Sequence, residues 1–354
     1  MLISSFDYDL PEGAIAQEPL PERDASRLLI LSRRSGETSH RSFRDLPDLL
    51  EAGDLLVANR SRVFPARLLG RRRGGGSAEV LLVRPSTGPE PDVRPSGPAD
   101  WEALVRPGRR LRPGDRIEIA ADLAVQILSE SVGADGRRRV RLEARDGNPA
   151  AALERVGHVP LPPYVRRPDR PEDRARYQTV YAREPGSVAA PTAGLHFTVA
   201  LLDRLASRGV RRAEVVLHVG PGTFRPVTVE DVAQHQVEPE PFVLPAETAQ
   251  AISETRAGGG RVIAVGTTTV RVLEARARDD RTATPGEGET GLVIVPGFPF
   301  RVVDALVTNF HLPRSSLLLL VCAFASRETV LGAYANAVGR GYRFYSYGDA
   351  MLIQ

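Results

Sequence analysis

The sequence contains no lysine, and all 47 of its basic residues are arginine. A pyridoxal Schiff base and a P-loop both depend on a lysine amine, so neither operates in this chain. Cysteine is almost as scarce, because Cys322 is the only one and lies inside an apolar run where we expect a buried structural thiol. A single cysteine excludes internal disulfides, a cysteine-ligated zinc site and a cysteine-held iron–sulfur cluster.

Long apolar runs are also lacking. The longest unbroken run, residues 317–325, is about half of the roughly 18 residues that a membrane-spanning helix requires. Residues 1–10 include Asp7 and Asp9 and have neither a basic start nor a long apolar stretch, so we expect no secretory signal. We therefore expect a cytoplasmic, globular protein without membrane partners, whose 42% hydrophobic residues suffice for a sizeable core.

The net charge is only +3, but the arginines are clustered. Clusters occur at residues 71–73, 106–112 and 137–141, and Arg109 and Arg110 are adjacent. Arginine binds phosphate through a planar fork of two donors, so these clusters can contact nucleic acid. A solvated strand face balanced by nearby acids explains them as well, and the sequence alone favours that interpretation.

Short alternating segments separated by turns run from residue 66 to residue 147. This spacing is typical of the strands of a small barrel. Residues 85–98 contain five prolines among Ser, Gly and Asp, and they indicate an exposed loop between two strands. The expected strands are residues 66–72, 78–84, 101–105, 116–119, 124–129 and 138–144.

From about residue 156 the pattern changes to strands alternating with helices, which indicates an α/β domain. A helix near residues 46–50 and a strand at 55–59 suggest that the amino-terminal stretch joins it. The sequence therefore predicts a discontinuous α/β domain, residues 1–65 and 151–354, with a small antiparallel β-barrel domain inserted at 66–150. Later helices are expected at 198–207, 247–257, from 268, at 316–325 and at 328–338, and strands at 214–219, 261–265, 292–295, 306–309 and 343–347.

One turn after an apolar strand is rich in hydroxyl groups. Gly266 is followed by Thr267, Thr268 and Thr269 at the expected start of a helix. The free backbone N–H groups of a helix N-terminus and three hydroxyls can hold a carboxylate or the hydroxyls of a ribose. Ordinary capping of the helix by one threonine explains the same residues equally well.

Three histidines lie beside turns or strand ends, where α/β domains usually carry their sites. His196 follows Gly194, His218 precedes a glycine turn, and His311 follows Asn309. Histidine titrates near neutrality, although a lone histidine more often satisfies hydrogen bonds than catalyses a reaction. No pair of histidines has a zinc-binding spacing, so we predict no metal site.

The carboxyl-terminal segment, residues 342–351, is dense in aromatic side chains and contains Asp349 directly after Gly348. Aromatic rings beside an arginine can stack on a purine, but they can equally fill a core. Taken alone, the segment favours core packing.

Ten segments, in the same order and across nearly the whole chain, resemble the S-adenosylmethionine:tRNA ribosyltransferase-isomerase family. They are residues 6–11 (FDYDLP), 21–23 (PER), 62–68 (RVFPARL), 160–164 (PLPPY), 177–181 (YQTVY), 189–197 (AAPTAGLHF), 217–220 (LHVG), 266–268 (GTT), 308–313 (TNFHLP) and 347–351 (YGDAM).

The chain departs from the family pattern in two places. Residues 59–62 read Asn-Arg-Ser-Arg where the family commonly has Asn-Asn-Thr-Arg. Glu238 and Pro239 stand where the family often has a second histidine followed by Ser or Ala. A role for that second histidine does not carry over, whereas His235 and Glu240 remain candidates.

The resemblance implies that the substrate is tRNA carrying 7-aminomethyl-7-deazaguanine at the wobble position. It also implies S-adenosylmethionine as cosubstrate, with no bound prosthetic group and no metal. The ribosyl unit of the cosubstrate becomes the epoxycyclopentanediol of epoxyqueuosine, and adenine and methionine are released. The family's fold, an α/β domain with an inserted small barrel, agrees with the pattern above. The oligomeric state stays open, and a monomer is one option.

This chemistry needs a general base at C5′, where the sulfonium acidifies the hydrogens, and a general acid for the departing adenine. Histidine and carboxylate side chains suit both tasks. The leading catalytic candidates are His196, His218, His311 and Asp349, ahead of Glu240 and the tyrosines. The expected cosubstrate contacts are Gly194, Gly266, Thr267, Thr268 and Asn309, and the expected tRNA phosphate contacts are Arg109 and Arg110.

Two other functions fit parts of the same sequence. An S-adenosylmethionine-dependent RNA methyltransferase would also use a strand–glycine–helix site and an arginine-rich flank, but it would release S-adenosylhomocysteine. A non-catalytic RNA-binding module built on the barrel would bind tRNA without turnover.

Overall fold

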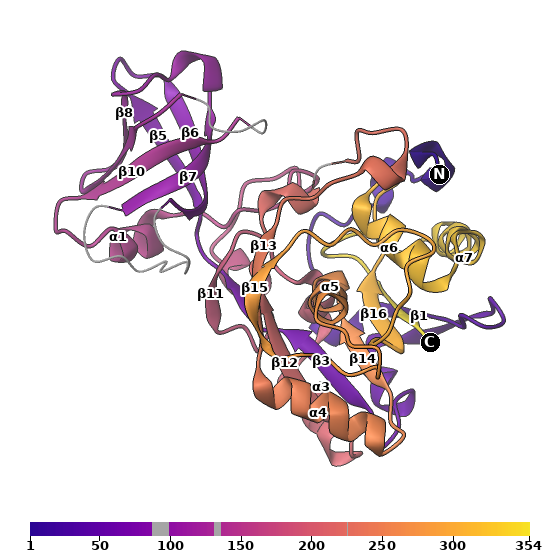
Figure 1. Cartoon of the computed structure of the whole chain (residues 1–354). Helices are drawn as coiled ribbons and strands as arrows, with labels where there is room; N and C mark the ends of the chain where they lie inside the picture. Colours follow the sequence, from indigo (N-terminus) through magenta and orange to yellow (C-terminus); the bar gives the residue numbers. More distant parts are fainter. Residues whose placement is uncertain (87–98, 131–135, 225) are drawn as a thin grey trace.

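The computed structural model describes residues 1–86, 99–130, 136–224 and 226–354 (Figure 1). A closed antiparallel barrel and a larger domain around a nine-stranded sheet make up the fold. The chain begins and ends in the larger domain, and the barrel is inserted between its strands. The predicted fold class, a discontinuous α/β domain with an inserted barrel, is confirmed. Most of the loop expected at residues 85–98 lies outside the described residues.

The nine-stranded sheet has the order β15-β13-β12-β3-β14-β16-β17-β1-β2. Its strands are β1 (Arg27–Leu31), β2 (Thr38–Ser42), β3 (Leu55–Asn59), β12 (Arg211–Leu217), β13 (Glu240–Leu244), β14 (Val262–Val265), β15 (Gly286–Thr290), β16 (Ala305–Asn309) and β17 (Ala350–Ile353). Strands β12, β3, β14 and β16 run parallel to one another at its centre. Their carboxyl ends therefore meet at one edge, where α/β proteins place ligand sites.

Both faces of this sheet are covered. Alternate residues of β3 point to opposite sides, so Leu55 and Val57 join one core while Leu56 and Ala58 join the other. The first core holds residues of α4 (Ala246–Ala257), α5 (Thr267–Ala275), α6 (Ser316–Ala325) and α7 (Arg327–Gly339). The second holds residues of α3 (Val199–Ser207) and of two 3-10 turns, η4 (Phe43–Asp48) and η6 (Thr192–His196).

The barrel closes in the order β10-β7-β6-β5-β8-β9. Its strands are β5 (Arg67–Arg72), β6 (Ser77–Pro85), β7 (Ala99–Arg106), β8 (Arg116–Ala120), β9 (Leu123–Ile127) and β10 (Arg138–Ala144), and all six were predicted to within a few residues. Trp101 fills its core at 1% exposure. Helix α1 (Pro149–Val156), which spans the boundary predicted at residue 150, packs Ala152 and Leu153 into the same core.

Two predicted strands are wrong. Residues 292–295 are irregular, and the edge of the sheet is formed instead by β15, whose Gly-Glu-Gly-Glu-Thr sequence is mostly exposed and shows no apolar alternation. Residues 343–347 are not a strand because Tyr345 has a φ of 73°, which breaks an extended backbone. The helix expected near residues 46–50 is the 3-10 turn η4, which contains Pro47.

Within the described residues, no single helix is long and apolar enough to cross a membrane. Helices α6 and α7 together meet the criteria of length and composition, but the chain bends by 112° between them. Both helices contribute buried residues to the core of the α/β domain, and Cys322 on α6 is 1% exposed, as expected.

Candidate active site between the barrel and the α/β domain

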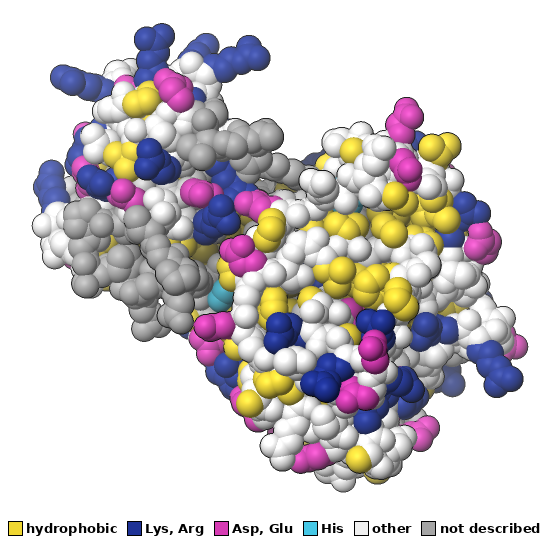
Figure 2. Space-filling model, in the orientation of Figure 1, with side chains coloured by type: hydrophobic (Ala, Val, Ile, Leu, Met, Phe, Trp, Pro, Cys, Tyr) yellow, Lys and Arg dark blue, Asp and Glu magenta, His cyan; other side chains and the backbone are white. Residues whose placement is uncertain are grey.

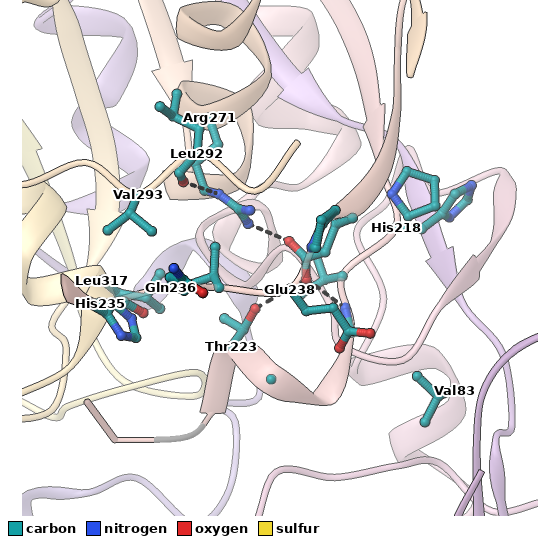
Figure 3. Close-up of a pocket in the computed structure, with 18 of the residues that line it drawn as sticks. Val83, His218, Thr223, His235, Gln236, Glu238, Arg271, Leu292, Val293 and Leu317 are labelled. Carbon is teal, nitrogen blue, oxygen red and sulfur yellow. Dashed lines mark hydrogen bonds and ion pairs between the residues drawn. The ribbon is translucent and has the colours of Figure 1, made fainter. Parts of the chain in front are cut away.

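A cavity of about 620 Å³, called the outer cavity below, opens between the barrel and the α/β domain (Figure 3). The barrel contributes Val83, Arg84, Trp101 and Arg137 to its wall. The α/β domain contributes the end of β12, residues 234–241, part of α5 and the start of α6. This volume lies in the range of pockets that hold nucleoside-sized ligands.

A buried ion pair between Glu240 and Arg271 braces the wall of the outer cavity (Figure 3). Glu240 also accepts a hydrogen bond from the Gly220 N–H at 2.8 Å, and it lies 3.4 Å from the Thr223 hydroxyl. The remaining donors of Arg271 bind backbone carbonyls, including that of Leu292 at 3.2 Å. Because each partner is satisfied, the pair tolerates burial and fixes α5 against β13.

A second charge cluster joins the two domains across the cavity. Glu238, from the segment before β13, forms an ion pair with Arg137 of the barrel. Arg137 Nη1 also lies 3.1 Å from the carboxylate of Glu102, which binds Arg84 at 2.9 Å. The departure from the family pattern at Glu238 therefore lies at a contact between the barrel and the α/β domain.

A smaller cavity of about 40 Å³, the inner cavity, adjoins the outer one, and Val219, Thr223 and Leu317 line both. It lies at the carboxyl ends of β14 and β16 and at the start of α5. The predicted cosubstrate residues Gly266, Thr267, Thr268 and Asn309 and the predicted catalytic residue His311 all line it. Five of the residues predicted for the site thus come together here.

Helix α5 begins at the inner cavity without a side-chain cap. Gly266 precedes it with a φ of 86°, a conformation that favours glycine. Thr267 and Thr268 are 6% and 8% exposed, and within the described residues the Thr268 hydroxyl has no hydrogen-bond partner. The site therefore offers unused donors in a buried position.

His196 lies behind this cavity and does not line it. Asn309 Nδ2 donates to His196 Nε2 at 3.0 Å and to the carbonyl of Tyr345, so the Nδ1–H of His196 donates to the Ser26 hydroxyl at 2.7 Å. The ring stacks on Phe43, with the ring centroids 5.0 Å apart. Burial, reinforced by Arg23 and Arg343, lowers the pKa of His196 to about 3. His196 is thus a neutral ring that orients Asn309.

His311 and His218 line different cavities. His311 Nε2 lies 2.9 Å from the Thr308 hydroxyl, and burial lowers the pKa of His311 to about 3. His218 lines the outer cavity, and burial lowers its pKa to about 4 despite the opposing effect of Glu184. Within the described residues, His218 Nδ1 is buried without a hydrogen-bond partner, and so is Nε2 of His235.

Asp349 and Gly194 line neither cavity. Asp349 is 1% exposed and accepts hydrogen bonds from the backbone N–H groups of Arg27 and Arg343 and from the Arg27 guanidinium. A Cβ at Gly194 would overlap the Tyr181 hydroxyl. The geometry explains both residues by packing and positioning rather than by contact with a ligand.

Arg109 and Arg110 are exposed on the 3-10 turn η5 (Gly108–Arg110) of the barrel, and within the described residues neither forms an ion pair. Arg71, Arg73 and Arg112 are exposed on the barrel in the same way. Basic side chains project from the end of the barrel that lies farther from the α/β domain (Figure 2). These unpaired cations are available to a polyanion.

The motifs alone did not identify Arg271, Thr223 or Arg137 as cavity residues. Arg271 follows Thr267 by four residues, so helical spacing alone places both on one face of α5. No sequence signal joins Arg137 to the cavity, because a separate domain supplies it. The described residues contain no cluster of three or more His, Cys, Asp or Glu side chains that could hold a metal ion.

Comparison with known proteins gives consistent matches. A family described as queuosine biosynthesis protein matches residues 3–353. Proteins named S-adenosylmethionine:tRNA ribosyltransferase-isomerase from Anaeromyxobacter dehalogenans (strain 2CP-C) and Symbiobacterium thermophilum are 51% and 52% identical, over 100% of this chain and 99% and 100% of their own lengths. The crystal structure of S-adenosylmethionine tRNA ribosyltransferase from Thermotoga maritima is 40% identical with a TM-score of 0.55, covering 99% of this chain and 100% of that one.

Proposed function

Because the chain belongs to the queuosine biosynthesis family of S-adenosylmethionine:tRNA ribosyltransferase-isomerases, we propose the following reaction for it. The enzyme transfers the ribosyl unit of S-adenosylmethionine to 7-aminomethyl-7-deazaguanine at the wobble position of tRNA and isomerises it. The products are epoxyqueuosine in tRNA, adenine and methionine. S-adenosylmethionine serves as cosubstrate, and no prosthetic group takes part.

The pair of joined cavities is the observation that carries this proposal. The reaction brings a small zwitterionic cosubstrate to a nucleobase that enters from a polynucleotide. The inner cavity, with its polar lining, suits part of the cosubstrate, and the outer cavity is large enough for a nucleoside. The outer cavity lies between two domains, a common position for a site that binds two substrates.

His218 is the side chain best suited to proton transfer. The reaction begins when a base removes a proton from C5′, which the adjacent sulfonium makes acidic, and later requires an acid for departing adenine. A histidine with a pKa of about 4 is neutral at pH 7, and its unpaired Nδ1 in the wall of the outer cavity can accept a proton. Once protonated, the same ring can return the proton to adenine.

The other predicted catalytic residues receive different roles. His311 contacts the inner cavity through a ring already bound to Thr308, so we assign it to holding the cosubstrate. His196 orients Asn309, and Asp349 ties the carboxyl-terminal turn to β1. We assign both to positioning, because neither lines either cavity.

The exposed arginines of the barrel support tRNA as the partner. Arg109 and Arg110 carry no ion pairs within the described residues, and phosphate contacts by arginine supply much of the affinity for nucleic acids. The substrate is a cytoplasmic RNA, so we propose a cytoplasmic location.

The reaction is tested by incubating the pure protein with S-adenosylmethionine and tRNA that carries 7-aminomethyl-7-deazaguanine. We expect epoxyqueuosine in the tRNA, together with one adenine and one methionine for each turnover. Formation of S-adenosylhomocysteine and a methylated tRNA would instead identify a methyltransferase. Binding of tRNA without any product would identify a non-catalytic module.

A further inference from the structure

We propose that the inner cavity is a carboxylate site that holds the methionine end of S-adenosylmethionine, with the adenosine end in the outer cavity. This inference rests on the proposed function and adds the orientation of the cosubstrate. The carboxylate is the only anionic group of S-adenosylmethionine, so the position of an anion site fixes which end of the molecule enters first.

The start of α5 is built to receive an anion. Side chains cap α1, α3, α6 and α7, but no side chain caps α5. The N–H groups of the first residues of an α-helix have no intrahelical acceptor and carry the positive end of its dipole. Thr267, Thr268 and Thr269 are all at most 8% exposed, so water cannot freely satisfy their N–H groups as it does at an exposed helix start.

The hydroxyl of Thr268 is a second and independent indication of a ligand. Among the three threonines, Thr269 donates its hydroxyl to the carbonyl of Val265 at 2.7 Å. Thr268 lines the inner cavity, and its buried hydroxyl oxygen has no partner within the described residues. A buried hydroxyl without a partner is costly, and a carboxylate oxygen would accept its hydrogen bond.

The lining of the inner cavity also selects for a negative group. Among the described residues that line it there is no Asp, Glu or Arg, so neither a competing carboxylate nor a counter-charge is present. His311, the one titratable histidine in the lining, is held neutral by burial. The polar groups left to bind a ligand are therefore mainly donors: the helix N–H groups and the Thr268 hydroxyl.

The sizes of the two cavities match the two ends of the cosubstrate. The inner cavity, about 40 Å³, has room for a carboxylate and its neighbouring atoms, whereas adenosine needs the outer cavity of about 620 Å³. The short aminobutyrate chain then brings the sulfonium to the junction lined by Val219, Thr223 and Leu317. His218, in the outer cavity, lies on the ribose side of that junction.

The test compares the binding of S-adenosylmethionine with that of decarboxylated S-adenosylmethionine, by titration calorimetry on the full chain without tRNA. Hydrogen bonds to a charged group contribute enough that we expect the intact cosubstrate to bind roughly 10-fold to 100-fold more tightly. Thr268→Val, which removes only the hydroxyl, should reduce this preference by roughly tenfold. Thr269→Val is the matched control, because the Thr269 hydroxyl faces the helix backbone, and it should keep the full preference.

Equal affinity of the unaltered protein for the two ligands would overturn the orientation, whatever the variants do. A loss of affinity in Thr268→Val that is equal for both ligands would also overturn it. If the protein binds neither ligand but does bind tRNA, the proposed function itself fails. If it binds both equally and still forms epoxyqueuosine, only the carboxylate assignment is wrong.

Discussion

Acidification from pH 7 to pH 5 should destabilise this protein, because His196 and His311 are buried in the neutral form. Both side chains are 4% exposed, and burial lowers the pKa of each to about 3. In the unfolded chain a histidine has a pKa of about 6.5. Between these values the unfolded state binds more protons than the folded state, so the free energy of unfolding falls as the pH falls.

The magnitude follows from proton linkage. Below pH 6.5 each such histidine removes about 1.4 kcal/mol from the free energy of unfolding for each pH unit. From pH 6.5 to pH 5 the two together remove about 4 kcal/mol, a large part of the 5–15 kcal/mol that stabilises an ordinary domain. Unfolded carboxylates titrate near pH 4, so the histidines dominate in this window.

The assay is urea unfolding at pH 7, 6 and 5, in the unaltered protein and in two variants. His196→Gln should lose about 1.4 kcal/mol per pH unit of this dependence, because only one of the two histidines remains. Phe43→Leu is the control, since Phe43 stacks on His196 and its replacement should lower stability equally at every pH. A free energy of unfolding that stays constant from pH 7 to pH 5 would refute the reasoning, as would an unchanged pH dependence in His196→Gln.

Three further outcomes are expected. His218→Ala should lower the single-turnover rate by roughly 100-fold to 10,000-fold while S-adenosylmethionine still binds; a loss below about tenfold would exclude acid–base catalysis by this ring. Replacing Arg109 and Arg110 by alanine should weaken tRNA binding and reduce its salt dependence by about one unit of slope per contact, and an unchanged slope would return them to a solvated face. Glu238→Gln should raise the KM for tRNA more than it lowers kcat, because it weakens the contact with Arg137; unchanged kinetics would show that the contact is dispensable.

The fold was predictable where local pattern and burial agree. The all-apolar strand β3 and the capped helix α3 were predicted to within one residue, because buried strands and N-capping threonines have strong local signals. The sequence signal failed at the edge of the sheet. Strand β15 is mostly exposed and polar, and its pairing with β13 depends on tertiary contacts that alternation does not record.

The site was predictable only in part, for a related reason. Strand ends and glycine turns identified the residues of the inner cavity, because one sheet edge brings them together. They could not separate His196, which lies behind the wall, from His218, which lies in it, since both stand beside a turn. Arg137 reaches the site from the barrel, and local sequence carries no information on how two domains meet.

The division between saturated and unsaturated groups fits the proposed chemistry. Glu240 already binds Arg271 and a backbone N–H, and Asp349 already binds Arg27, so either carboxylate would have to break an ion pair to accept a proton. A neutral His218 has no such partner to lose within the described residues. A carboxylate free in the cavity would also attract the sulfonium and hold the ground state, which lowers KM without helping the chemical step. A neutral ring gains a charge only as the proton leaves C5′, so its favourable interaction with the developing ylide is made in the transition state.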